Sequence, residues 1–200
     1  MKTSRILLLA ASAMLFGACN KEEISGSSDT TRLVPMTFTA SSASQTRTQL
    51  TEGNAVHWNE RDRIAIWDGT NKNEFTAGTV NGSEATFTGM AAEAENYIAF
   101  YPSDAVTSID ATSIKFTVPA QQTAVPGTFA QNLAPSWART TDGDTSLQFR
   151  NLCALVKFTV AEEMAGEGTF TFVGGKATEK LAGDLTYTIG DGSMTVLKLA

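Results

Sequence analysis

The residue types that carry most enzyme chemistry are scarce in this chain of 200 residues. It has one histidine, His57, within the run Val-His-Trp, and two cysteines, Cys19 and Cys153. A metal site has no second histidine to use, and no serine or cysteine stands near His57 in a nucleophile motif. We therefore expect His57 to be a surface or packed residue of a protein that is not an enzyme and holds no metal or cofactor.

Two further patterns, an Asp-Gly-Asp run and the many glycines, do not match ligand-binding motifs. Asp142 and Asp144 flank a glycine, as in a calcium loop, but the remaining ligands of an EF-hand are missing, so a turn is expected. The many glycines form no phosphate-binding motif at a junction of strand and helix. A hydrolase is the least favoured class of protein, because the sequence offers no acid–base pair.

Three tryptophans, Trp58, Trp67 and Trp137, raise the question of ligand binding, because exposed indole rings stack against flat ligand surfaces. Trp58 and Trp67 fall on predicted strands, where packing inside the protein is commoner. Pro135 and Ser136 place Trp137 near a loop. Trp137 is therefore the residue that we predict for stacking against a glycan, with packing on the sheet as the alternative.

Residues 1–18 have the composition of a secretory signal peptide. A basic start, Met1–Arg5, precedes the uncharged run Ile6–Phe16 and the small residues Gly17 and Ala18. The uncharged run is too short to span a bilayer core, which needs about 20 apolar residues. The alternative is a buried N-terminal helix.

Cys19 directly follows the expected cut, and the run Phe-Gly-Ala-Cys resembles the bacterial lipobox. We predict that Cys19 carries lipid, because an exposed thiol is reactive outside the reducing cytosol and two or more acyl chains anchor a protein stably. Ordinary cleavage that leaves a free thiol is the alternative. Cys153 is expected to be a small buried apolar side chain, and nothing in the sequence pairs it with Cys19.

Residues 19–32 are predicted to form a flexible tether, since they are rich in serine, threonine, glycine and charge. Their acidic run Asn20–Glu23 resembles the surface-export signal of Bacteroidetes lipoproteins, which predicts a surface-exposed lipoprotein of the outer membrane; a merely solvated tether is the alternative. Removal of residues 1–18 takes away Lys2 and Arg5 and no acid, so the net charge falls from −6 to −8. Such an acidic chain is a poor partner for nucleic acid.

Residues 33–200 show apolar and polar residues in alternation, broken by turns, which predicts a single all-β domain. Strands that recur every 8 to 12 residues or so favour an antiparallel β-sandwich. Asn81-Gly82-Ser83 and Asp191-Gly192 predict hairpins. The predicted strands are 34–40, 63–67, 74–80, 84–88, 96–101, 113–118, 147–149, 152–160, 169–173, 185–189 and 194–199.

The sequence supports further expectations for two of these strands and for two short segments outside them. Pro35 cannot donate a hydrogen bond to a ladder, so the first strand is expected at a sheet edge. Residues 96–101 are apolar on both faces, which predicts a central strand that is covered on both sides. Residues 90–95 and 161–165 have helical composition, but each offers only a turn or two of helix.

A series of short motifs runs through residues 36–183. They are Phe38-Thr-Ala40, Thr46-Arg-Thr48, Val56-His-Trp58-Asn59 with Asp62 and Ile64, Ala85-Thr-Phe87-Thr-Gly89, Tyr97-Ile-Ala99-Phe-Tyr101-Pro102, Val118-Pro119-Ala-Gln-Gln122, Leu147-Gln-Phe149-Arg-Asn151-Leu152 and Leu181-Ala-Gly183. In this order they resemble the fimbrillin-like family of Bacteroidetes lipoproteins, in the branch similar to the minor-fimbrium proteins.

This resemblance implies a transthyretin-like β-sandwich of Greek-key type and a role as a structural or accessory subunit, or an adhesin, of fimbriae. In that family a protease is thought to cut after an arginine and remove the first strand, and another subunit fills the groove with its own strand. Ladder hydrogen bonds then give affinity, and alternate side chains in pockets give specificity. The implied partners are other fimbrial subunits, the outer membrane through the lipid, and host or bacterial glycans or proteins.

Arg32 and Arg47 flank the first predicted strand and are therefore the residues that we consider for such cleavage. Arg47 follows the strand, so a cut there would release residues 34–40. The alternative is that Arg47 is a surface residue in a threonine-rich turn.

The end of the sequence departs from the family pattern. Family members usually continue into a second β-domain, so we expect either a shortened chain or a one-domain relative. Residues 194–200 are expected to be the last strand of the domain, with a donor strand as the alternative. A carbohydrate-binding surface module for nutrient capture is the alternative function from a different class of protein.

Overall fold

The structure, a computed structural model, describes residues 32–42, 57–123, 132–154, 156, 159–161, 166, 168–176 and 179–198. Within these residues it contains β-strands, one short 3₁₀ turn, Ser103–Ala105, and no α-helix. The strands are β1 Leu33–Ser42, β2 Arg63–Trp67, β3 Lys72–Asn81, β4 Glu84–Ala92, β5 Tyr97–Tyr101, β6 Val106–Ile109, β7 Ser113–Val118, β8 Ser136–Thr140, β9 Ser146–Asn151, β10 Gly183–Thr188 and β11 Met194–Lys198. The predicted all-β class is confirmed.

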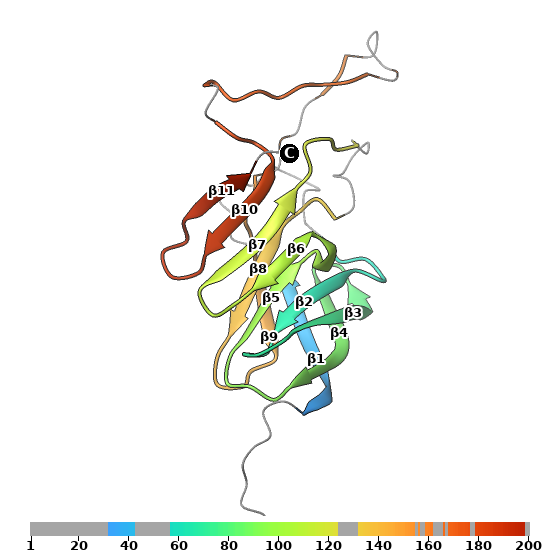
Figure 1. Cartoon of the computed structure of the whole chain (residues 1–200). Helices are drawn as coiled ribbons and strands as arrows, with labels where there is room; N and C mark the ends of the chain where they lie inside the picture. The colour runs from blue at the N-terminus through green and yellow to red at the C-terminus, as the bar shows by residue number, and fades with distance from the viewer. Residues whose placement is uncertain are drawn as a thin grey trace, which may run out of the picture.

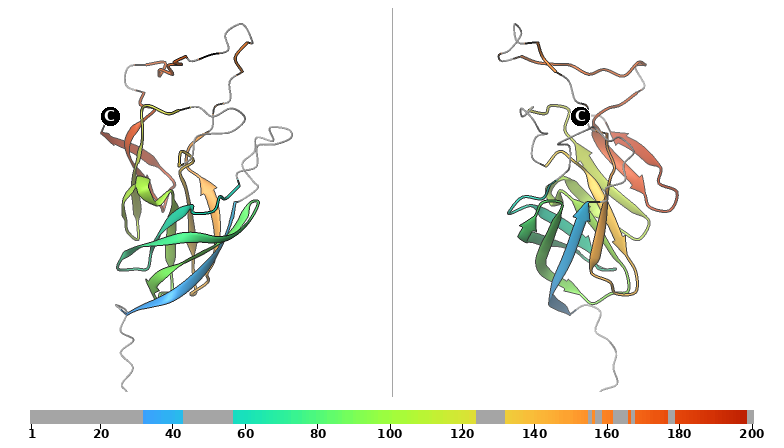
Figure 2. Two further views of the ribbon diagram at one scale, coloured as in Figure 1. Left: turned by 90° about the vertical axis from the view of Figure 1, so that its right-hand side faces the viewer. Right: turned by 180° about the vertical axis from the view of Figure 1, so that it is seen from behind.

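Seven strands close into a barrel in the order β1-β4-β3-β2-β5-β8-β9, and β9 pairs back with β1 (Figure 1). Each neighbouring pair is antiparallel except β1 and β9, which run parallel. In the view from behind in Figure 2, β1 (blue) lies between β4 (green) and β9 (orange). β1 is therefore the strand that closes the barrel.

The other four strands form an antiparallel sheet in the order β11-β10-β7-β6. One face of this sheet packs on the barrel strands β2, β5 and β8 through an apolar cluster that includes Ile98, Phe100, Phe116 and Leu185. The rings of Phe100 in β5 and Phe116 in β7 lie with their centroids 5.0 Å apart. All five residues of β5 are buried, so the prediction of a central strand covered on both sides is confirmed.

The interior of the barrel is filled mainly by aromatic rings. Phe38 of β1 meets Phe75 of β3 and Tyr97 of β5 edge to face, with centroids 5.2 and 4.9 Å apart. This arrangement places the positive edge of one ring on the negative face of another. Gly89 in β4 gives Phe75 its space, because a Cβ at Gly89 would lie 2.8 Å from the Phe75 ring and 2.8 Å from the Glu74 carbonyl oxygen.

Both predicted hairpins are present. β3 and β4 are joined at Gly82, and β10 and β11 at Gly192, and both glycines have positive φ, 63° and 69°. Such φ values favour glycine, which has no Cβ to collide with the backbone. The expected strand at residues 194–200 is present as β11, Met194–Lys198, which pairs with β10 in the same sheet.

Other predictions were wrong or hold only locally. The prediction of purely antiparallel pairing was wrong, because β1 and β9 are parallel. Among the described parts of 152–160 and 169–173 no strand occurs, and residues 90–92 belong to β4 rather than to a helical turn. The prediction that the first strand is an edge strand was wrong, because β1 pairs with β4 on one side and with β9 on the other. At Pro35, however, β1 pairs with β4 alone, because its pairing with β9 begins only at Thr39.

Replacing Gly89 with alanine tests the fit of β4 against β3. We expect Gly89→Ala to lower the free energy of unfolding by about 2 kcal/mol, since the new methyl group overlaps Phe75 and a backbone oxygen. Gly190→Ala is the matched control, because nothing lies within 4 Å of its Cβ position, and it should change stability by less than about 0.5 kcal/mol. Urea denaturation gives both values, and equal stability of the two variants would contradict this account.

Candidate functional site

The slot that β1 occupies, between β4 and β9, is the candidate interaction site. On one side β1 pairs with β4 over nine residue pairs, from Leu33 opposite Ala92 to Ser41 opposite Glu84. On the other side it pairs with β9 over only four, from Thr39 to Ser42. Parallel pairing is also slightly less stable per residue than antiparallel pairing. The seam with β9 is therefore the weaker of the two seams that hold β1.

Alternate side chains of β1 point into the slot. Phe38 is fully buried and Ala40 is 2 % exposed, while Met36 is partly buried at the margin of the same cluster. The Met36 sulfur lies 3.7 Å from the hydroxyl oxygen of Tyr97. These inward residues occupy separate places along the barrel core, which is the geometry that lets a strand be recognised by its side chains.

Trp58 closes one end of the slot. Its ring meets Phe87 of β4, Tyr101 of β5 and Phe149 of β9 edge to face, with centroids 5.1, 5.3 and 5.2 Å apart. It therefore joins the two walls of the slot, β4 and β9, independently of β1. The Trp58 indole nitrogen is buried and has no hydrogen-bond partner among the described residues, so the side chain acts through packing.

The segment that carries Trp58 is fixed by Asp62. A carboxylate oxygen of Asp62 accepts a hydrogen bond from the Asn59 backbone N–H at 2.8 Å, and the Tyr101 hydroxyl lies 3.4 Å from the other oxygen. Burial, followed by the negative charge of Asp62, raises the pKa of Tyr101. Tyr101 is therefore a neutral hydrogen-bond donor in this core.

The chain leaves β1 and returns to the barrel at one turn. The Ser42 N–H donates to the Ser83 carbonyl oxygen at 3.1 Å, and the Trp58 N–H donates to the Gly82 carbonyl oxygen at 3.0 Å. Ser42 and Trp58, which flank residues 43–56 outside the described part of the chain, therefore both lie beside the β3–β4 turn. A break within them would leave β1 attached through its ladders and Trp58 attached to the rest of the barrel.

The end of β4 is held by Asp68, in the turn between β2 and β3. Its carboxylate accepts hydrogen bonds from the backbone N–H groups of Thr70, Asn71 and Ala92 at 3.0, 2.7 and 3.0 Å and from the Asn73 amide at 2.7 Å. Burial alone would raise the pKa of Asp68, but these four donors outweigh it and lower the pKa below its ordinary value.

Of the four predicted site residues, Arg32 and Trp137 fall in the described part of the chain. Cys19 and Arg47 are outside the described residues, and Arg32 is exposed directly before β1. Trp137 is the second residue of β8 and so lies near the irregular segment 132–135, as predicted; it is partly buried, and its ring centroid is 5.1 Å from that of Tyr187 in β10. Its role in stacking a ligand stays a prediction.

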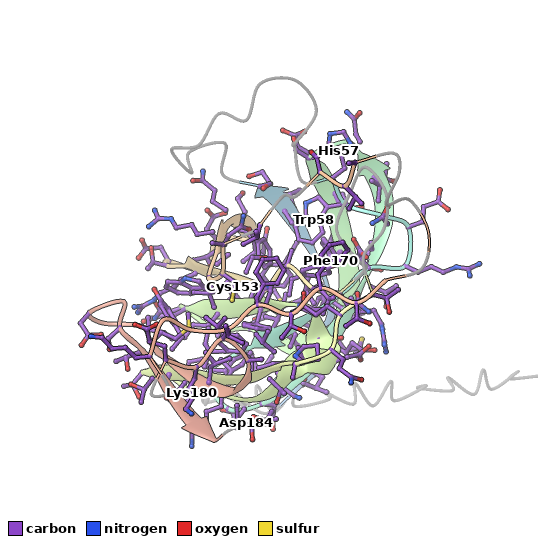
Figure 3. The ribbon with its side chains drawn as sticks, turned by 90° about the horizontal axis from the view of Figure 1, so that it is seen from above. His57, Trp58, Cys153, Phe170, Lys180 and Asp184 are labelled. Carbon is purple, nitrogen blue, oxygen red and sulfur yellow. The ribbon has the colours of Figure 1, made fainter. Side chains whose placement is uncertain are left out.

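The structure also shows the surroundings of His57, of the aspartates Asp142 and Asp144, and of Cys153. His57 is exposed, and Trp58 is buried as expected but lies outside the strands, so its predicted place on a strand was wrong. Figure 3 shows the two residues close together. Asp142 and Asp144 lie in the turn between β8 and β9, as predicted, where Asp144 accepts a hydrogen bond from the Ser146 N–H at 3.0 Å. Cys153 is half-buried against the second apolar cluster, and burial raises the pKa of its thiol.

The described residues contain no group of three or more histidine, cysteine, aspartate or glutamate side chains that is placed to hold a metal ion. No helix in the same part of the chain has the length and apolar character needed to cross a membrane. Comparison with protein-family models, with curated proteins and with solved structures gave no match to this chain. The slot and the surface around it are therefore the features of the molecule that bear on its function.

Substitution of Trp58 tests whether it joins the walls of the slot. Trp58→Ala should lower the free energy of unfolding by about 3–5 kcal/mol, because it removes a buried ring and leaves a cavity between β4, β5 and β9. Trp58→Phe should cost clearly less, since the indole N–H that it removes has no partner. Guanidinium denaturation followed by circular dichroism measures both, and a loss below about 1 kcal/mol for Trp58→Ala would contradict the assignment.

Acid stability tests Asp68. Because its pKa is lower in the folded state, the carboxylate stabilises the fold above its unfolded pKa, about 3.9, and this contribution disappears as the pH falls through the lower folded value. Asp68→Asn should therefore be less stable than the parent chain at about pH 7, and the difference should shrink at about pH 3. Urea denaturation at both pH values measures this, with the exposed Asp142→Asn as control; a constant difference would argue against the assignment.

Proposed function

We propose that this chain is a non-enzymatic lipoprotein of the outer cell surface, similar to fimbrillin-like proteins, that serves as a structural or accessory subunit or adhesin of fimbriae. In this proposal Cys19 carries the lipid and residues 19–32 are the tether. The barrel and the four-stranded sheet together correspond to the transthyretin-like, Greek-key sandwich of that family. Assembly proceeds by exchange of a β-strand between subunits.

The position of β1 is the observation that carries this proposal. β1 is a ten-residue strand at the N-terminal side of the fold, and it is the element that joins β4 to β9 in the ladder. Its removal would expose two strand edges and the space of Phe38 at once. Unpaired edges readily accept a strand from another chain, so the vacated slot would bind a donor strand with the same alternation.

The placement of Arg47 fits this mechanism. It lies in residues 43–56, whose two flanks are both held at the Gly82–Ser83 turn, so a cut after Arg47 severs β1 from the remaining strands without touching their ladders. The same cut separates the barrel from the lipid on Cys19. A cut after Arg32 would remove the tether alone and leave β1 in place.

Exposed apolar side chains between β9 and β10 give the protein a second feature of an assembly subunit. Val156, Phe170, Phe172, Val173 and Leu181 are each more than half exposed, and Val173 reaches 80 %. Figures 1 and 2 show residues 168–174 as an extended segment beyond the ends of the strands. Exposed apolar groups that gather in one stretch of chain are a feature of protein–protein contact surfaces.

Cleavage and assembly can be tested together in cells. We expect the parent chain to give a ladder of bands on unboiled gels, and its fimbria-associated form to begin at Thr48. Arg47→Ala should remove the ladder and leave the intact chain in the membrane, because β1 then stays attached.

Arg32→Ala is the matched control and should assemble normally. N-terminal sequencing of the protein in the membrane and fimbrial fractions shows where each form of the chain begins. A ladder that persists in Arg47→Ala, or fimbrial protein that still contains residues 33–42, would contradict assembly by exchange of β1.

A further inference from the structure

A groove on the outer surface of the barrel crosses the weaker seam beside β1. It has a volume of about 400 Å³, within the size range of ligand sites, and is lined by the outer faces of β1, β3, β4 and β9. Its polar lining residues are Thr39, Ser41, Thr79, Asn81, Glu84, Thr86, Ser146 and Gln148. The slot described above faces the core, and this groove faces solvent.

The strand register arranges these side chains in two rows across the barrel. Asn81 lies opposite Glu84, Glu84 opposite Ser41, and Ser41 opposite Gln148. In the neighbouring row Thr86 lies opposite Thr39, and Thr39 opposite Ser146. Directly opposed residues on one face of a sheet have their Cβ atoms about 5 Å apart, so one small ligand reaches several of them.

An irregularity in β3 lies beside this groove. The register between β3 and β4 shifts between Ala77 and Val80, and a bulge of this kind bends the strand. Gly78 lies in the bulge, where a Cβ would be only 3.3 Å from the Thr86 hydroxyl oxygen. The Thr79 N–H donates to that oxygen at 3.1 Å, so the Thr86 hydroxyl is fixed in position and can still donate its own proton.

We propose that this groove binds a neutral carbohydrate. Its five hydroxyl groups and two amides both donate and accept hydrogen bonds, and the Glu84 carboxylate accepts them, which matches the neighbouring hydroxyl groups of a sugar. The described lining contains no lysine or arginine, and Glu84 repels anions, so phosphate and acidic sugars are disfavoured. The lining also includes the apolar residues Ala40, Ala85 and Leu147, which are nearly fully buried.

This inference deepens the proposed adhesin role, but its test does not need assembly. The double variant Glu84→Gln with Gln148→Ala removes the negative charge on one side of β1 and the amide group on the other. The control is Thr37→Ala with Thr88→Ala, an exposed, directly opposed pair on β1 and β4 that is not part of the lining. All variants are made in the full chain carrying Arg47→Ala, so that β1 stays attached.

The probe is an array of neutral oligosaccharides that end in galactose, glucose, mannose or N-acetylhexosamine, printed beside their sialylated and sulfated counterparts. We expect retention on neutral glycans, a loss of at least about tenfold in the groove variant, and no change in the control. Denaturation midpoints confirm that both variants fold.

Three results would overturn the proposal. They are the absence of retention on any neutral glycan, an equal loss in the control variant, and binding that Trp137→Ala abolishes while the groove variant keeps it. None of them bears on fimbrial assembly, because laddering is measured separately and in chains with an intact Arg47.

Discussion

The closure of the barrel by one strand is the constraint on which the rest of this structure depends. In the ladder β4 and β9 are joined through β1, by long antiparallel pairing on one side and short parallel pairing on the other. Without β1 both edges would carry unpaired backbone groups, and the aromatic core around Phe38 would be open to water. A protein that gives up this strand must therefore receive another in its place.

Several parts of the fold could be predicted from the sequence because they depend on local pattern. Alternation assigned Phe38 and Ala40 to the buried face of the first strand, and the Asn-Gly pair located the β3–β4 hairpin. The apolar run 97–101 indicated a strand covered on both sides, which β2, β8 and the second sheet explain. In each case a single segment contains the information.

The remaining features depend on which segments meet, and alternation does not determine this. The parallel pairing of Thr39 with Ser146 joins residues that no turn connects, and the packing of Trp58 needs three strands at once. Residues 169–173 have the pattern of a strand, yet a strand also needs an edge to pair with. The groove could not be predicted for a similar reason, because its polar residues are visible as outward positions while the hollow between them is formed by four strands together.

The two faces of β1 connect the two proposals. Its inward side chains, chiefly Phe38, determine whether a strand fits the slot, and its outward side chains Thr39 and Ser41 belong to the proposed sugar groove. Exchange of β1 would therefore replace part of the groove with residues of the donor. Assembly and ligand recognition would then be coupled through a single strand.

A reversible cross-link between β1 and β9 tests the central claim most directly. Thr39 and Ser146 are direct neighbours in the parallel ladder, at a spacing suited to a disulfide, so cysteines at both positions, with Cys153→Ala, should lock β1 in place. We predict that the oxidised protein forms no ladder on unboiled gels, even when it is cut after Arg47, and that reduction restores assembly. Equal assembly of the oxidised and reduced protein would contradict exchange of β1.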